Sequence, residues 1–181
     1  LLIRGATVHT SSPRGTIEEG DVLVRNGRIA AVGTGLAAAP GAIVIEARGR
    51  PLTAGLFGGI TAFGVEEISG EPSTVDNSPM VRAAGESLEP RPEFDVTVAF
   101  NAESVPISVN RAEGLTFAVV APSAVTGGTV LAGQGAVARL DGRIEAFPAT
   151  SRTLFVNLGP EATSASGMSR AAQFMLLDQA V

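Results

Sequence analysis

The feature that most constrains the fold is a run of apolar and glycine residues at positions 52–61. Its order is Leu-Thr-Ala-Gly-Leu-Phe-Gly-Gly-Ile-Thr, without a charged side chain. Strands that are buried on both faces of a parallel sheet form such near-continuous apolar runs, whereas half-exposed strands alternate apolar with polar residues. We therefore predict a buried parallel strand over 52–61.

The residues before this run indicate a small all-β unit. We predict strands over 2–9, 21–25, 28–32 and 42–47, separated by short loops. Asn26-Gly27 lies between the second and third of these strands, and this dipeptide tolerates the positive φ angles of a tight hairpin turn. Residues 33–41 are rich in Ala, Gly and Pro and are predicted to form a surface loop.

The residues after the run are more varied. Residues 64–93 are acidic, contain four prolines and have almost no helical periodicity, so we predict a long loop of the kind that is functional or mobile. We then predict a helix over 102–113, a second apolar strand over 115–121 and two short strands over 129–131 and 136–140. A strand over 153–158 and a helix over 169–181 follow, and the helix pattern stops without a Gly or Asn cap.

Several of these segments resemble the metal-dependent amidohydrolases, and imidazolonepropionase-like members are the nearest look-alikes. The resemblance rests on residues 2–8, 20–33, 42–50 and 50–62, and it extends to a Gly-Leu-Thr strand start at 114–116. It implies an α/β fold. Residues 1–53 would form a small N-terminal β-sandwich, completed by C-terminal strands outside this chain. Residues 54–181 would form the first part of a partial TIM-type (β/α) barrel.

The motif that holds the metal in this family is replaced in this chain. The family has an aspartate followed by His-x-His on the first barrel strand, and the matching positions here are Gly58, Ile60 and Ala62. Neither Ile nor Ala has a lone pair for a metal. The chain also has no Lys, so it cannot supply the carbamylated lysine that bridges the metals of many binuclear relatives. For His9, the only histidine, we expect a structural or surface role.

Three residues are candidates for substrate binding. Glu66 and Glu67 directly follow the first barrel strand, where the resemblance places the catalytic mouth of the barrel. Carboxylates there could bind metal or act as acid and base, and the alternative is an ordinary solvated loop. Gln134, in the glycine-rich segment 126–142, offers a donor and an acceptor to the same pocket. Asp76 is interpreted as a turn residue. We assign no catalytic residue.

Composition argues against several functional classes. The net charge is −5, the thirteen basic residues are all Arg without forming a stripe, and Tyr and Trp are absent, so nucleic-acid binding is not expected. The absence of Cys excludes disulfides and thiolate metal sites. No apolar run reaches the roughly 18 residues that a membrane span requires. No Gly-x-Ser-x-Gly elbow occurs, which argues against a serine hydrolase.

The length adds a further expectation. A complete (β/α)₈ barrel needs roughly 250 residues, and this chain has 181. We expect the remaining C-terminal part of the same polypeptide to complete the barrel, with a small-molecule substrate and a second subunit as further partners. Because the first residue is Leu, removal of a leader is one interpretation, and a cytoplasmic and a periplasmic location both stay open.

The resemblance implies a hydrolase that acts on C–N bonds of linear or cyclic amides, with a divalent metal such as Zn²⁺ that activates water. Since this chain offers no first-strand ligands, the full-length protein would hold at most one metal, with ligands from later strands. The alternative is a catalytically inactive amidohydrolase-fold protein that serves as a binding or assembly module. Histidines at the ends of later strands would favour the enzyme.

Overall fold

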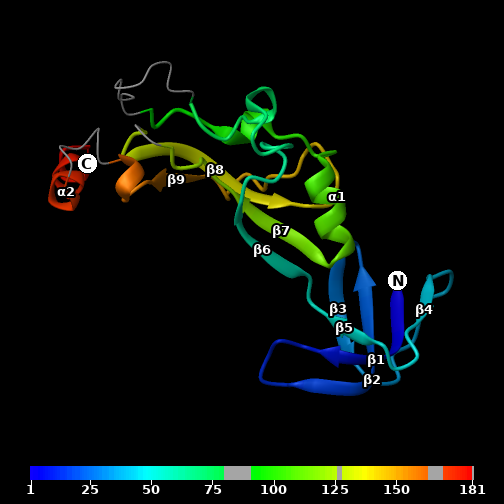
Figure 1. Cartoon of the computed structure of the whole chain (residues 1–181). Coiled ribbons are helices and arrows are strands. Elements are labelled where there is room, and N and C mark those ends of the chain that lie inside the picture. Colours follow the sequence, from blue (N-terminus) through cyan, green and yellow to red (C-terminus); the bar gives the residue numbers. More distant parts are fainter. Residues whose placement is uncertain (80–90, 126–127, 163–168, 181) are drawn as a thin grey trace. The chain divides into compact units, whose positions relative to one another are not determined.

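The computed structural model describes residues 1–79, 91–125, 128–162 and 169–180. The chain divides into two units, Leu1–Gly55 and Leu56–Val181. Each unit has its own sheet (Figure 1). Each unit also has its own buried apolar cluster. The fold is therefore mixed α/β and rich in strands.

The first unit is a single five-stranded sheet in the order β3-β2-β1-β4, with β5 also paired to β1. β2 and β3 continue the sheet from β1 in antiparallel fashion, whereas β4 and β5 run parallel to β1. Asn26 and Gly27 both have positive φ between β2 and β3, which confirms the predicted hairpin. The expected β-sandwich is not confirmed in the described residues. The strands are β1 (Leu2–His9), β2 (Thr16–Arg25), β3 (Arg28–Gly33), β4 (Val44–Glu46) and β5 (Pro51–Thr53).

A buried carboxylate ties a loop to the first sheet. Asp21 is 2% exposed, and its two oxygens accept backbone N–H groups of Gly5 at 2.9 Å and Leu36 at 2.8 Å. Two charge-assisted hydrogen bonds offset the cost of burying this charge. The loop after β3 is thereby fixed against β1, beside an apolar cluster of Ala6, Val8, Val22 and Ala47.

The second unit contains a four-stranded sheet in the order β6-β7-β8-β9. β6 and β7 are parallel, and α1 lies between them in the chain, as in the opening of a β/α fold. β8 and β9 continue the sheet in antiparallel fashion, so the described residues do not form a closed barrel. The elements are β6 (Leu56–Thr61), η1 (Pro72–Thr74), η2 (Val96–Ala99), α1 (Val105–Ala112), β7 (Leu115–Val120), β8 (Leu131–Arg139), β9 (Thr153–Val156), η3 (Pro160–Ala162) and α2 (Arg170–Ala180).

The prediction of one buried strand over 52–61 is wrong in two respects. Residues 51–53 form β5, which pairs with β1 in the first unit, and the next strand begins only at Leu56. β6 is also not buried on both faces, since Phe57 and Ile60 are exposed. The apolar cluster that includes Ile107 of α1 covers one face of this sheet. The other face is not covered by described residues, so apolar side chains of β6 on that face are exposed.

The prediction of two separate strands over 129–131 and 136–140 is also wrong, because β8 is continuous through Gly133 and Gly135. A Cβ atom on Gly135 would overlap the carbonyl oxygen of Val120, and one on Gly133 would overlap that of Phe94. The glycines therefore permit close approach of neighbouring backbones and do not interrupt the strand.

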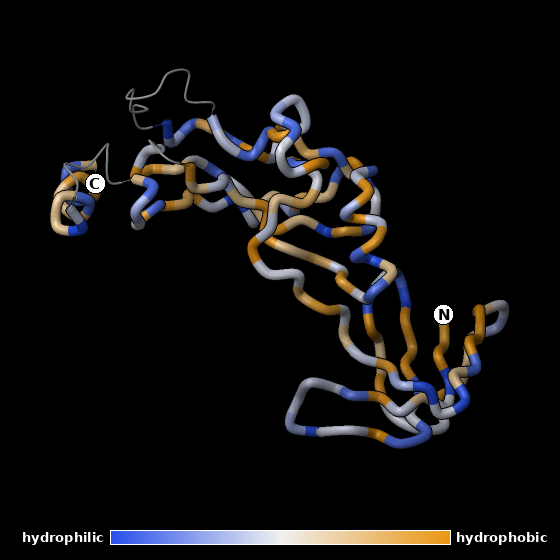
Figure 2. Tube along the Cα trace, in the orientation of Figure 1, coloured by the Kyte–Doolittle hydropathy of each residue, from blue (hydrophilic) through white to orange (hydrophobic). Residues whose placement is uncertain are grey.

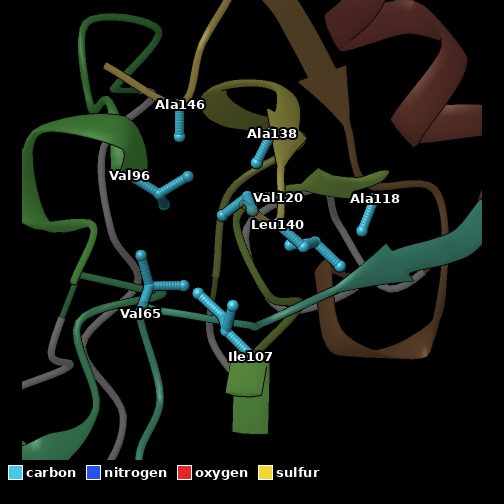
Figure 3. Packing of buried hydrophobic residues seen from close by; sticks show 8 residues of the cluster. All are labelled: Val65, Val96, Ile107, Ala118, Val120, Ala138, Leu140 and Ala146. Atoms are coloured by element: carbon cyan, nitrogen blue, oxygen red, sulfur yellow. The ribbon is translucent and has the colours of Figure 1, made fainter. Parts of the chain in front are cut away.

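The main core lies on one face of the second sheet (Figure 3). Side chains from the segment after β6, from η2, α1, β7 and β8 converge there, and the hydropathy along these elements is shown in Figure 2. This packing fixes the ends of β6 and β7. The buried members are Val65, Val96, Ile107, Ala118, Val120, Ala138, Leu140 and Ala146.

The predicted C-terminal helix is present as α2, with an unusual distribution of side chains. Gln173 is its buried residue and donates from Nε2 to the carbonyl of Gly159 at 2.8 Å, whereas Phe174 and Met175 are exposed. No helix among the described residues has the length and apolar character needed to cross a bilayer.

Candidate functional site

The two parallel strands of the second unit end beside each other. β6 ends at Thr61 and β7 at Val120, and these two residues are paired. In β/α folds, functional residues lie in the segments that follow the carboxyl ends of parallel strands. Here those segments are the residues after Thr61, which include Glu66 and Glu67, and the residues from Ala121 onward. They define the candidate site.

Glu66 is held by a buried amide. Its Oε2 accepts a hydrogen bond of 2.7 Å from Nδ2 of Asn77, a residue that is 3% exposed. The Asn77 carbonyl accepts the N–H of Ser123 at 2.8 Å, so one residue connects the segments after β6 and β7. Leaving a buried amide without a hydrogen-bond partner costs about 1–3 kcal/mol. Because separation of Asn77 from Glu66 would incur this cost, the contact holds the Glu66 carboxylate in place. Oε1 of Glu66 has no hydrogen bond among the described residues.

Sequence reasoning missed Asn77. It lies in an acidic, proline-containing segment next to Asp76 and two serines, and nothing in its residue type separates it from these neighbours. Asp76 itself is exposed, and its backbone N–H donates to the carbonyl of Val65 at 2.8 Å. Its side chain makes no hydrogen bond among the described residues, so the interpretation as a side-chain turn residue finds no support there.

Glu67 caps helix α1. Its Oε1 accepts the N–H of Val105, the first residue of the helix, at 2.9 Å. Ser104 occupies the N-cap position, and its buried Oγ has no hydrogen-bond partner among the described residues. The nearby Ser104 hydroxyl and the Val105 N–H together lower the pKa of the Glu67 carboxyl. One oxygen of Glu67 is thus already engaged in the fold.

Gln134 lies within strand β8 and not in the loop that the sequence suggested. Its Nε2 donates to the carbonyl of Pro92 at 2.9 Å, and its backbone N–H donates to that of Phe94. It lines a shallow depression of about 370 Å³, together with Pro92, Arg152, Thr153 and Leu154. No hydrogen bond joins Gln134 to Glu66 or Glu67 in the described part of the chain.

The three positions that match the metal motif carry no ligand. Ile60 is 71% exposed on an open face of the second sheet, and Ala62 is partly buried. Across the described ranges, no group of three His, Asp or Glu side chains is arranged to hold a metal ion. His9 lies in the first unit, where its Nδ1 is 3.0 Å from Oγ1 of Thr16.

No protein-family model matches the sequence, and no curated protein matches it significantly. Among solved structures, the crystal structure of an amidohydrolase from Thermotoga maritima MSB8 is similar, with a TM-score of 0.80 and 22% sequence identity. The similarity covers 98% of this chain and 45% of that protein, so the chain spans less than half the length of its structural relative. At this level of identity the similarity concerns the fold, and the fold of this chain is amidohydrolase-like.

Proposed function

We propose that this chain contributes the N-terminal part of an amidohydrolase-type hydrolase, which cleaves C–N bonds of linear or cyclic amides. The observation that carries the proposal is the similarity of fold to the Thermotoga amidohydrolase over 98% of the chain. The imidazolonepropionase-like sequence features support the same class. The remaining polypeptide completes the barrel in this proposal, and a second subunit is a further partner.

A divalent metal such as Zn²⁺ would activate water in this reaction. The first-strand positions of this chain do not fit that metal, because Ile60 and Ala62 have no lone pairs. Ligands for at most one ion would therefore come from strands outside this chain. The role of this chain is to bind substrate and to position it.

The three proposed substrate contacts differ in which side-chain atoms are already hydrogen-bonded within the fold. Oε1 of Glu66, which has no partner in the described ranges, would accept an N–H of the substrate while Asn77 holds the other oxygen. Glu67 has only the oxygen that α1 does not engage. Gln134 offers its amide oxygen in a separate depression, because its Nε2 is bonded to Pro92.

The substitution Glu66→Gln tests the first of these contacts. The amide keeps an oxygen for the Asn77 donor, so the local fold is retained while the charge is lost. In the full-length enzyme we expect KM for an amide substrate to rise about tenfold with a smaller change in kcat, as for loss of a ground-state contact. The exposed Asp76→Asn serves as the control. An unchanged KM in Glu66→Gln would show that the Glu66 carboxylate does not contact the substrate.

The second candidate function is an inactive binding or assembly module. The observation that favours it is the apolar character of Ile60 and Ala62, at positions that normally bind metal in the family. Two measurements on the full-length protein, purified without chelators, separate the two functions. One is its metal content, and the other is its hydrolysis of a panel of linear and cyclic amides. About one equivalent of Zn or Mn with amide hydrolysis supports the enzyme. A folded, metal-free and inactive protein supports the module.

A further inference from the structure

Strand β6 contains a bulge. Between the pairs Phe57–Phe117 and Ile60–Val119, β6 advances three residues where β7 advances two, and this interval contains Gly59, whose φ is +77°. Between Leu56–Leu115 and Phe57–Phe117, β7 advances two residues where β6 advances one, so the two shifts cancel over the length of the strand. Glycine in this left-handed conformation is the usual first residue of one class of bulge, and bulges redirect the side chains that surround them.

The bulge places positions 58 and 60 on opposite faces. Phe57 and Phe117 stack on the open face with ring centroids 5.1 Å apart, and Ile60 is exposed on that same face. Position 58 faces the other way, because a Cβ on Gly58 would lie 3.0 Å from Cδ2 of Leu115 and 3.2 Å from Cβ of the buried Ala118. In an uninterrupted strand, residues two apart point to the same face.

The end of the strand separates position 62 from position 60. β6 stops at Thr61, and the carbonyl of Ala62 accepts the N–H groups of Val65 and Glu66, both at 3.0 Å, which closes a turn. Ala62 is partly buried and packs against the apolar cluster that includes Val65. Ile60, in contrast, is on the open face.

We infer that the backbone of β6 prevents metal chelation by positions 60 and 62, even when both carry histidine. Imidazole nitrogens must converge on one point at about 2.0–2.1 Å to share a Zn²⁺ ion. Side chains on an open face and in a turn behind the strand do not converge in this way. This inference concerns the backbone and goes beyond the proposed function, which depends on ligands outside this chain.

Zinc affinity of designed variants tests this inference. The variants of the full chain are Ile60→His, Ala62→His and the double variant, with any affinity tag removed. Zn²⁺ is titrated against a chromophoric chelator, and Co²⁺ absorption reports histidine ligation. We expect the double variant to bind Zn²⁺ no more than about threefold more tightly than the better single variant. A gain of about tenfold or more would overturn the inference.

A second double variant, which leaves Ala62 unchanged, tests the same inference if Ala62→His disturbs folding. Ile60 and Val119 are partners across two neighbouring strands, which lie about 4.8 Å apart, and they share the open face. The pair Ile60→His with Val119→His should therefore bind Zn²⁺ about tenfold more tightly than Ile60→His alone. Failure of this pair, in a protein with wild-type circular dichroism, would overturn the face assignment on which the inference rests.

Discussion

Glu66 and Glu67 are adjacent, yet their carboxylates have different partners in the fold. Glu66 accepts a hydrogen bond from the buried Asn77, and Glu67 accepts one from the first N–H of α1. The second contact places a negative charge at a helix N-terminus, where unsatisfied N–H groups and the helix dipole favour it. The stability of this region should therefore depend on the protonation of Glu67.

The substitution Glu67→Gln should lower stability at neutral pH and have little effect in acid. A carboxyl with a lowered pKa in the folded state stabilises the fold above its ordinary value of 4.5. That contribution is lost as pH falls through the folded-state pKa, because the acid then protonates in both states. Thermal midpoints of wild type and variant should differ at pH 7 and converge below that pKa. Glu145→Gln, at an exposed loop position, is the control, and a pH-independent difference would contradict the prediction.

The substitution Asn77→Asp should be strongly destabilising at pH 7. It replaces the donor of the 2.7 Å hydrogen bond with a second carboxylate, buried beside Glu66. We expect the free energy of unfolding in urea to fall by about 2 kcal/mol. Asp76→Asn, the reverse exchange at the exposed neighbouring position, should change it by less than about 0.5 kcal/mol. Equal effects at both positions would show that the Asn77 amide does not hold Glu66.

At the level of elements, the bulge in β6 depends on a glycine. Gly59→Ala places a Cβ at a φ of +77°, which costs an L-residue about 1–2 kcal/mol. Open space surrounds the position, so a clash would not account for the loss. Gly33→Ala, also in open space at a strand end but without positive φ, should be close to neutral in the same urea titration. A neutral Gly59→Ala would show that β6 is not bulged at this residue.

Single helices, strands and turns could be predicted from the sequence better than the pairing and continuity of the strands. The Asn26-Gly27 hairpin, the helix after residue 102 and the strand from Leu115 could be predicted, because local turn chemistry and apolar runs specify them. The continuity of β8 could not, since glycine usually weakens strands, and only contact with Val120 and Phe94 explains its presence. The bulge at Gly59 likewise depends on pairing with β7.

The candidate site was predictable only in part. Two carboxylates directly after an apolar strand indicate a position at the strand end, and the structure places Glu66 and Glu67 there. The contact between Glu66 and Asn77 spans eleven residues and depends on tertiary folding, so no local pattern reveals it. Gln134 lies within β8, where it lines a depression separate from the two glutamates, and its place in the glycine-rich segment does not reveal this.

At the scale of the whole molecule, large apolar side chains are exposed within the second unit. Phe57, Ile60 and Phe117 lie on the open face of its sheet, and α2 exposes Phe174 and Met175. Exposed apolar side chains that lie together, as Phe57 and Phe117 do, form a surface that an apolar probe can bind. The open sheet face is therefore expected to bind hydrophobic probes.

The fluorescence of an apolar dye such as ANS measures this surface. The double substitution Phe57→Ser with Phe117→Ser removes the stacked pair and should lower dye fluorescence of the folded chain. Ile144→Ser is the control, because Ile144 is 92% exposed and lies outside the strands. An equal decrease in both variants would show that the dye responds to scattered side chains and not to the open face.

The shape of β6 also has a consequence for protein engineering. Ile60 is exposed on the open face, whereas Ala62 lies in the turn after the strand and packs against the apolar cluster. On the inference drawn above, histidine at both positions creates no shared metal site. A designed site in this chain would therefore start from a cross-strand pair on the open face, such as Ile60 and Val119.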